Sequence, residues 1–190
     1  MIRLKLKKQI KALSLVEVMV ATVISITVGI AVMALFVQGS RLWSFIIGRS
    51  EINSGGEAAM NYMTNELKYA TVEAGSPARI VISAGHDSIT FFLPTDLDGN
   101  WGAVDNLGET EWDTGNPIQY IYIPASNSLI RTEGGIQATL AKNVTGVEFK
   151  DNTIDGTLLR EELMIILTLT KQTQQRVVSA TFTSRTKLRN

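Results

Sequence analysis

The chain has 190 residues, of which 45% are hydrophobic and only 19% are charged. Its 18 basic and 18 acidic residues give a formal net charge of zero, without the basic excess typical of nucleic-acid-binding proteins. We therefore expect no nucleic-acid partner. The absence of cysteine excludes disulfides, thiolate metal sites and a cysteine nucleophile. The length fits one domain, with or without a membrane anchor.

The N-terminal region divides into a basic segment and an apolar segment. Residues 1–12 carry five cations and no acid, and residues 13–37 contain a single charged residue, Glu17. At about 1.5 Å per residue, the apolar segment is long enough to cross a bilayer as a helix. It exceeds the apolar core of about 7–15 residues in a signal peptide, and a buried core helix would not need the cationic flank. The positive-inside rule places the N-terminus in the cytoplasm and the chain after about residue 38 on the far side.

Glu17 is the feature that a plain signal anchor leaves unexplained. A carboxylate within a membrane helix costs about 2–3 kcal/mol near the centre and less near an end. Cleavage after Ala12 would make Leu13 a cationic N-terminus, and residues i and i+4 share one face of a helix. Glu17 would then pair with that amine or with the amine of a neighbouring subunit, where the helix dipole also favours an anion. Such a pair is suited to fixing the axial register of an assembly.

The segment Lys11–Ala21 resembles the cleavage and methylation signature of type IV prepilins. It reads Lys-Ala-Leu-Ser-Leu-Val-Glu-Val-Met-Val-Ala, and the family has Gly followed by Phe-Thr-Leu-Ile-Glu-Val-(Met/Leu)-(Val/Ile)-Ala. The resemblance implies a leader, residues 1–12, which prepilin peptidase removes between Ala12 and Leu13. It also implies N-methylation of Leu13 and a role of Glu17 in assembly. Ala12 stands in place of Gly and Leu13 in place of Phe, and the first departure predicts slower processing.

The residues after the apolar segment predict a second, amphipathic half of the helix over 38–74. Apolar residues recur there at three- and four-residue steps and form one stripe that we expect to cover a sheet. The stripe consists of Leu42, Phe45, Ile46, Ile52, Ala59, Met60, Met63, Leu67 and Ala70. Gly55 and Gly56 predict a bend or weak point, and Gly75–Pro77 predicts the end of the helix.

Residues 75–190 predict a β-rich domain. Strands are expected at 79–83, 88–93, 118–123, 128–132, 144–150, 158–171 and 176–185, the last two as a hairpin. One long helix followed by an antiparallel sheet makes the fold class α+β. This order of elements is similar to the pilin fold, in which a long N-terminal helix packs on an antiparallel sheet.

Shorter stretches extend the resemblance to J-type minor pseudopilins of type II secretion systems and to PilW-like minor pilins of type IV pili. These stretches are residues 88–93, 96–100, 118–123, 128–131, 140–149 and 185–190. The resemblance implies a structural protein that spans the inner membrane once, has a periplasmic domain, and later enters a filament, at its tip. Its partners would be other minor and major pseudopilins or pilins, prepilin peptidase, the inner-membrane assembly platform and membrane lipid.

An acidic stretch lies in the β-rich domain, with seven acids and no Lys or Arg over residues 86–115. Asp96, Asp98 and Asn100 are candidate calcium ligands, because calcium prefers six to eight oxygens. The spacing does not match an EF-hand, since Gly99 directly follows Asp98, and a solvated acidic loop is the favoured interpretation. No other cofactor is expected. The alternative function is a membrane-tethered periplasmic module that binds a ligand or calcium and does not polymerise.

The sequence offers no catalytic constellation. Its single histidine, His86, lies in a predicted tight turn, 85–88, and the adjacent Asp87 and Ser88 cannot adopt the geometry of a triad with it. No glycine-rich phosphate loop is present. We therefore expect no enzymatic activity, and an anchored hydrolase lacks a convergent nucleophile and base.

The neutral total charge is a sum of unlike parts. Removal of residues 1–12 would leave 13 basic and 18 acidic residues, a formal charge of −5. The last twenty residues, 171–190, again hold five cations and no acid. The sequence therefore predicts an acidic domain with a basic C-terminal strand, a polarity that would orient it against its neighbours.

Overall fold

The computed structural model describes residues 14–70, 80–96, 111, 115–173 and 176–188. The chain separates into two compact units, Met1–Trp43 and Ser44–Asn190. One helix, α1 (Leu15–Leu67), contributes to both units.

In the first unit, α1 is apolar and unpacked. Residues 14–36 are all exposed, although valine, isoleucine, leucine and methionine dominate them. The hydroxyls of Thr22 and Thr27 donate to the carbonyl oxygens of Val18 and Val23, at 2.7 and 2.9 Å, so these polar groups are satisfied within the helix. By length and composition, α1 is a helix that could cross a membrane, and a signal sequence has the same properties. A long apolar N-terminal helix is thus confirmed.

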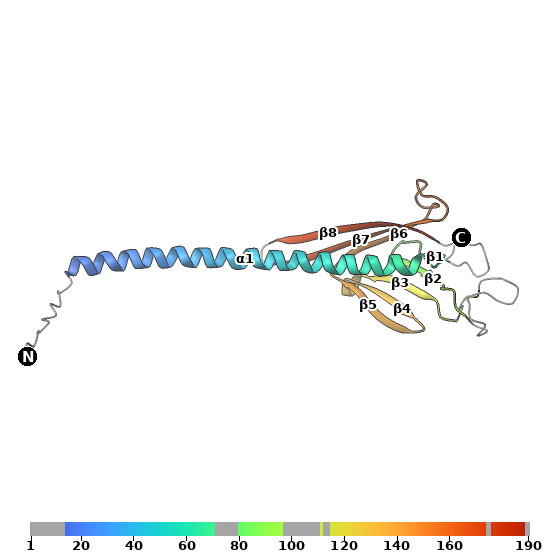
Figure 1. Ribbon diagram of the computed structural model, residues 1–190, viewed down its shortest axis with the longest axis horizontal. Coiled ribbons are helices and arrows are strands. Elements are labelled where there is room, and N and C mark those ends of the chain that lie inside the picture. Colours follow the sequence, from blue (N-terminus) through green and yellow to red (C-terminus); the bar gives the residue numbers. More distant parts are fainter. Residues whose placement is uncertain (1–13, 71–79, 97–110, 112–114, 174–175, 189–190) are drawn as a thin grey trace, which may run out of the picture. The chain divides into compact units, whose positions relative to one another are not determined.

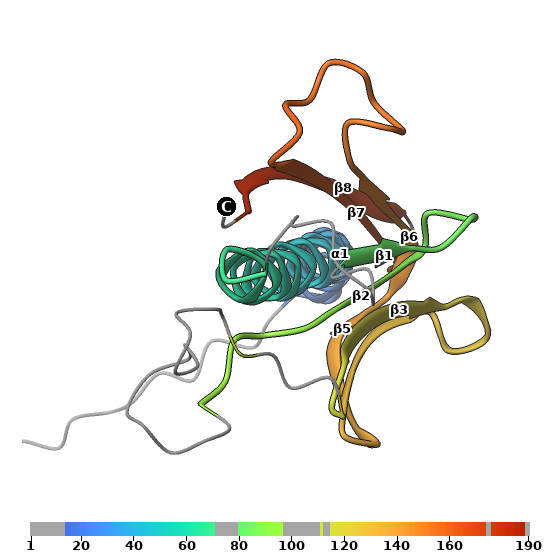
Figure 2. The same cartoon turned by 90° about the vertical axis from the view of Figure 1, so that its right-hand side faces the viewer.

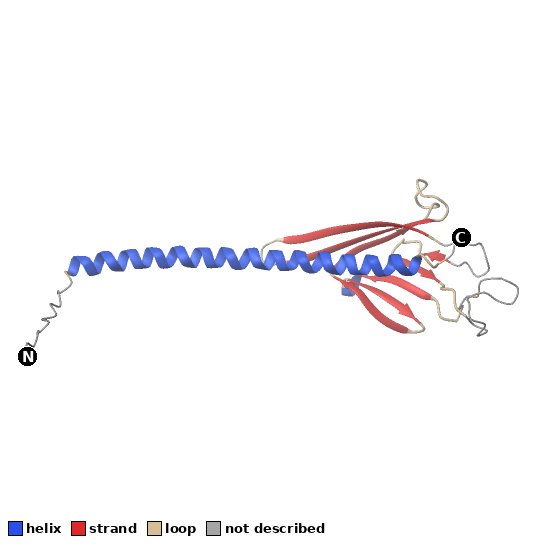
Figure 3. Cartoon of the chain, viewed as in Figure 1, coloured by secondary structure: helices blue, strands red, loops and turns tan. Residues whose placement is uncertain are grey.

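In the second unit, the remaining turns of α1 lie between two antiparallel sheets (Figures 1 and 2). The first sheet has the order β1-β2-β3-β4-β5, and the second has the order β6-β7-β8. The strands are β1 (Ile80–Ile82), β2 (Ser88–Phe91), β3 (Ile118–Ile123), β4 (Ser128–Glu133), β5 (Ile136–Lys142), β6 (Val144–Lys150), β7 (Glu162–Gln172) and β8 (Val177–Lys187). A short 3₁₀ helix, η1 (Pro124–Ser126), joins β3 to β4. All strands follow the long helix in the chain, so the α+β layout is confirmed (Figure 3).

Backbone hydrogen bonds connect the two sheets near β6. The amide of Phe149 donates to the carbonyl oxygen of His86 at 2.8 Å, and the amide of Val144 donates to that of Asn127 at 2.9 Å. His86 and Asn127 both adopt left-handed backbone conformations, with φ of 59° and 47°. These turns bend the chain so that their carbonyl groups face β6. The two sheets are therefore connected along one side of the helix.

The predicted apolar stripe contributes to the core, with a change at its start. Six of its members are buried in one cluster with inward-facing strand residues, namely Ile52, Ala59, Met60, Met63, Leu67 and Ala70. Phe45 packs partly against this cluster. Leu42 and Ile46 are 62% and 55% exposed, so the prediction that they belong to the buried stripe was wrong. The helix reaches Phe45 before either sheet covers it fully.

The weak point expected at Gly55 and Gly56 does not interrupt the helix. The helix continues through both residues, and Gly56 is buried. A Cβ atom at Gly56 would lie 2.2 Å from the ring of Phe182 on β8, whereas a Cβ atom at Gly55 would meet nothing within 4 Å. Gly56 therefore allows the close approach of helix and strand.

Other differences concern boundaries and the number of sheets. The helix ends at Leu67, before the predicted Ala74, and β7 begins at Glu162 because residues 158–161 form turns. The sequence interpretation missed β5, most of which is exposed and lacks the alternation that identifies a half-buried strand. It also assumed one sheet, whereas the strands form two. The predicted hairpin of the last two strands is confirmed as β7 and β8.

We predict opposite effects for two alanine substitutions in neighbouring helix positions. Gly56→Ala forces the Phe182 ring to move and should lower the free energy of unfolding of the second unit by about 1–3 kcal/mol. Gly55→Ala has open space and should raise it by up to about 1 kcal/mol through helix propensity. Urea unfolding of the detergent-solubilised protein, followed by circular dichroism, measures both. Equal stability of the two variants would contradict the close approach of α1 and β8.

Candidate functional site

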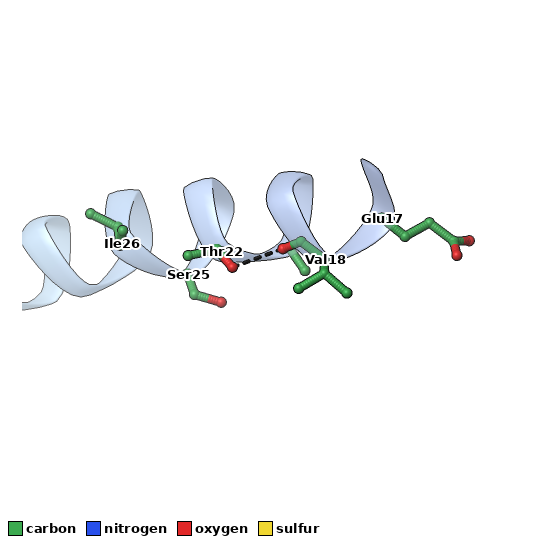
Figure 4. A pocket seen from close by; sticks show the side chains of 6 residues that line it. Glu17, Val18, Thr22, Ser25 and Ile26 are labelled. Atoms are coloured by element: carbon green, nitrogen blue, oxygen red, sulfur yellow. Dashed lines mark hydrogen bonds between the residues drawn. The ribbon is translucent and has the colours of Figure 1, made fainter. Parts of the chain in front are cut away.

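The first turn of α1 contains a capping interaction around Glu17. Ser14 directly precedes the first helical residue, and its amide donates to Glu17 Oε2 at 3.0 Å. This is half of the Ser-x-x-Glu capping box, which satisfies an amide that the helix leaves without a partner. In Figure 4 the Glu17 side chain extends from the end of the helix, away from Thr22 and Ser25. The carboxylate therefore lies where the helix dipole favours a negative charge.

This capping role was missed in the sequence interpretation, although the Ser-x-x-Glu pattern was readable there. It gives Glu17 a partner within its own chain. The predicted cleavage and methylation positions, Ala12 and Leu13, lie outside the described residues, as does the predicted leader, 1–12. The carboxylate of Glu17 is nevertheless directed at the backbone of Ser14, the second residue after the predicted cleavage.

Of the three predicted calcium ligands, the structure describes only Asp96. Asp96 is exposed at the end of a described segment, and Asp98 and Asn100 lie outside the described residues. Among the residues that the structure describes, no three His, Asp or Glu side chains are placed to hold a metal ion. His86 lies in the predicted turn, where Asp87 accepts a hydrogen bond from the Ser83 hydroxyl at 2.7 Å.

A second polar cluster joins the C-terminal end of α1 to the five-stranded sheet, and the sequence interpretation missed it. Arg131 on β4 donates from Nη2 and Nε to the Glu66 carboxylate of α1, at 2.9 to 3.1 Å. The Tyr120 hydroxyl on β3 donates to the same carboxylate. Arg131 also pairs with Glu133 at 2.7 Å and lies over the Tyr62 ring, 5.8 Å from its centroid. The side chains of Arg131 and Glu66 are only 13% and 17% exposed.

Burial and hydrogen bonding shift the protonation equilibria of this cluster. Burial raises the pKa of Tyr120 far above its ordinary value, and the hydrogen bond to Glu66 acts in the same direction. Burial lowers the pKa of Arg131, but the hydrogen bonds to Glu66 and Glu133 outweigh this effect and raise it overall. The guanidinium is therefore charged and the phenol neutral at ordinary pH. The cluster is an electrostatic clamp between helix and sheet.

Two sequence signals could have indicated this clamp. Arg131 occupies an inward-facing position of β4, two residues after the buried Leu129, and a charge there requires a partner. Glu66 lies in the helix immediately before the buried Leu67. Neither signal identifies the pairing by itself, because only the register between helix and sheet brings the two residues together.

Comparison with known proteins gives no match: neither a protein-family model, nor a curated protein, nor a solved structure is significantly similar to this chain.

We predict strong coupling between Glu66 and Arg131. Arg131→Met alone leaves a largely buried carboxylate without its cation and should lower the free energy of unfolding by roughly 3 kcal/mol. The double substitution Glu66→Leu and Arg131→Met should lower the free energy of unfolding clearly less than Arg131→Met alone, because neither charge of the pair remains. Denaturant unfolding of the four proteins of this double-mutant cycle measures the coupling. The pair Lys150–Glu148, whose side chains are 26% and 52% exposed, is the matched control and should show a coupling energy of at most about 1 kcal/mol. Additive losses at Glu66 and Arg131 would contradict the clamp.

We also predict a loss of stability in alkali that depends on Tyr120. The pKa of Tyr120 in the folded protein is raised above that in the unfolded chain. Its contribution to the free energy of unfolding is therefore complete below about pH 10 and is lost as the pH rises further, because the unfolded chain then releases the proton and the folded protein keeps it. The free energy of unfolding should fall above about pH 10 by up to about 1.4 kcal/mol per pH unit from this group. Tyr120→Phe should reduce that slope, measured by unfolding between pH 8 and pH 11 or so. Tyr69→Phe removes an exposed tyrosine as the matched control, and an equal reduction there would refute the assignment.

Proposed function

We propose that this chain is a minor pseudopilin or minor pilin with the pilin fold. In this proposal, prepilin peptidase removes residues 1–12, and the mature subunit enters the tip of a type II secretion pseudopilus or a type IV pilus. The protein is structural and spans the inner membrane once, with its second unit in the periplasm. Its partners are other pseudopilins or pilins, the peptidase and the inner-membrane assembly platform.

The observation that carries the proposal is the placement of Glu17. It is the single charged residue of segment 13–37, it lies in the first turn of α1, and its carboxylate points back at Ser14. Cleavage after Ala12 would create an ammonium group at Leu13, immediately before that hydrogen-bonded amide. A carboxylate held at this end is suited to bind its own amine before assembly and a neighbour's amine afterwards.

The exposed apolar half of the helix supports the same proposal. Residues 14–36 are exposed in the isolated chain, so their apolar surface needs lipid or other helices as its surroundings. Lipid supplies these surroundings before assembly, and the helices of neighbouring subunits supply them in a filament. A lone carboxylate gives that otherwise uniform surface one axial register.

Replacement of Glu17 by alanine tests the proposal. The tagged Glu17→Ala protein should insert into the membrane as the wild type does, but its recovery in sheared filaments or with co-expressed partner subunits should fall by at least about tenfold, since an unpaired or missing charge shifts assembly by several kcal/mol. Ser25→Ala, an uncharged change farther along the same exposed helix, is the matched control and should leave recovery unchanged.

The mature N-terminus must be determined in the same preparations. Mass spectrometry should find a chain that starts at N-methylated Leu13 in the wild type, and cleavage at the same bond in the Glu17→Ala variant. An intact leader, or a start at another residue, contradicts the proposal. Normal recovery of Glu17→Ala in assemblies would contradict the role of Glu17. Absence of the wild-type protein itself from filaments and partner complexes would favour a tethered binding module that does not polymerise.

A further inference from the structure

The five-stranded sheet turns one face toward α1 (Figure 2), and its other face carries a hollow. Ile89 and Tyr120 are buried in the core with the helix, so their neighbours Thr90 and Gln119 lie on the outer face. The hollow has a volume of about 440 Å³, within the roughly 300–1,000 Å³ of small-molecule sites. We call it the outer-face hollow, and its lining includes Thr90, Pro117, Gln119, Thr132, Gly134 and Gly135.

Three polar side chains form a row across this hollow. The strand register pairs Thr90 with Gln119 and Gln119 with Thr132, so the row crosses β2, β3 and β4 at right angles to the strands. Neighbouring strands are about 4.8 Å apart, which sets the interval between the three side chains. Each is half-buried, and none of the three side chains hydrogen-bonds another residue that the structure describes. The row therefore has donors and acceptors that the described part of the chain does not use.

The outer face of the three-stranded sheet treats its hydroxyl groups differently. There the Thr170 hydroxyl forms hydrogen bonds with those of Thr145 and Ser179, at 3.1 and 3.2 Å. The hydroxyls of Thr168 and Thr181 are likewise bonded to each other, at 3.3 Å. Cross-strand hydroxyl pairs of this kind stabilise a sheet by themselves. The row in the outer-face hollow makes no such pairs, so its polar groups are free to bind a ligand.

The turn between β4 and β5 and the residue before β3 leave room beside the row. Gly134 and Gly135 both adopt left-handed conformations, with φ of 54° and 82°, which residues with side chains rarely adopt. A Cβ atom at Gly135 would meet nothing within 4 Å, so bare backbone and open space adjoin the row. Pro117 is exposed, and its ring offers an apolar C–H surface at the same hollow. A ligand can therefore lie along the row without meeting a bulky side chain of this turn.

The chemistry of the lining favours an uncharged ligand rich in hydroxyl groups. None of the described residues that line the hollow is charged, so they offer no ion pair to an ionised ligand. Hydroxyl and carboxamide groups both donate and accept hydrogen bonds, as sugar hydroxyls do. The interval of about 4.8 Å between strands is also close to the repeat of the rings in an extended β-1,4-linked glycan. Successive sugar rings would thus meet successive members of the row.

We propose that the outer-face hollow binds an uncharged, extended glycan of β-1,4-linked sugar rings. Thr90, Gln119 and Thr132 exchange hydrogen bonds with the ring hydroxyls, and Pro117 contacts the C–H face of a ring. The binding is non-covalent and changes no bond of the glycan. The hollow lies entirely within the second unit, so this inference goes beyond the proposed function and depends on neither membrane insertion nor assembly.

Calorimetric titration of the full-length protein with cellohexaose tests the proposal, in a detergent that itself carries no sugar. The wild type should bind with a Kd of about 0.1–1 mM. Gln119→Ala and Thr132→Val should each weaken binding by about fivefold or more, because each removes a hydrogen bond to the glycan. Thr183→Val removes an exposed hydroxyl of β8, outside the hollow, and is the matched control that should bind as the wild type does. Circular dichroism verifies that all three variants are folded.

Two further probes test the chemical class of the ligand. Maltohexaose has the same rings in a curved, α-linked chain, and a hexapeptide of serine and glycine has hydroxyls and amides without sugar rings. Both should bind at least about fivefold more weakly than cellohexaose. Tighter binding of the hexapeptide would overturn the proposal in favour of a peptide site, and equal binding of maltohexaose would overturn the match between rings and strands.

The proposal is also overturned if cellohexaose at about 5 mM does not bind, or if it binds equally to Gln119→Ala, Thr132→Val and the wild type. An equal loss in Thr183→Val would place the glycan elsewhere on the surface and refute the assignment to the hollow. The proposed function is measured separately, by the mature N-terminus and by the recovery of Glu17→Ala in assemblies. Failure of glycan binding leaves those measurements unchanged, so the two failures are distinguishable.

Discussion

The second half of α1 has to pack against two sheets at once, and the architecture of the second unit depends on this constraint. A helix that contacts one sheet needs one apolar stripe, but this helix also has to let β8 approach from another side. Gly56 meets the requirement by offering no side chain to the Phe182 ring, and Gly48 does the same for Thr173. Each of these glycines makes the helix about 1 kcal/mol less stable than alanine would at the same position. The close packing that the glycines permit offsets this cost.

At the other end of the same helix, a polar contact replaces this close packing. Glu66 accepts hydrogen bonds from Arg131 and Tyr120, and these three groups are largely or fully removed from water. Apolar contacts in the rest of the core tolerate small shifts of the helix. A carboxylate bound by a guanidinium and a phenol does not tolerate such shifts, because each misplaced partner leaves a buried charge without a hydrogen bond. The clamp therefore determines the register of α1 on the five-stranded sheet.

The first half of α1 follows a different rule, since its apolar side chains over residues 14–36 are exposed. The hydroxyls of Thr22 and Thr27 are satisfied by their own helix, and the Glu17 carboxylate caps the first turn. Such a helix is suited first to lipid and then to other helices. In the proposed function both surroundings are used in turn, with Glu17 as the polar contact that changes partner.

Periodicity and charge are local properties of the chain, and they were enough to predict the α+β order, the long apolar helix, most of the buried stripe and the importance of Glu17. The capping box around Glu17 was equally local, although the interpretation overlooked it. The number of sheets, the strand Ile136–Lys142, the role of Gly56 and the pairing of Arg131 were decided only by the tertiary structure. Each of these depends on which residues from distant parts of the chain meet across the helix, and spacing along the sequence does not encode that choice.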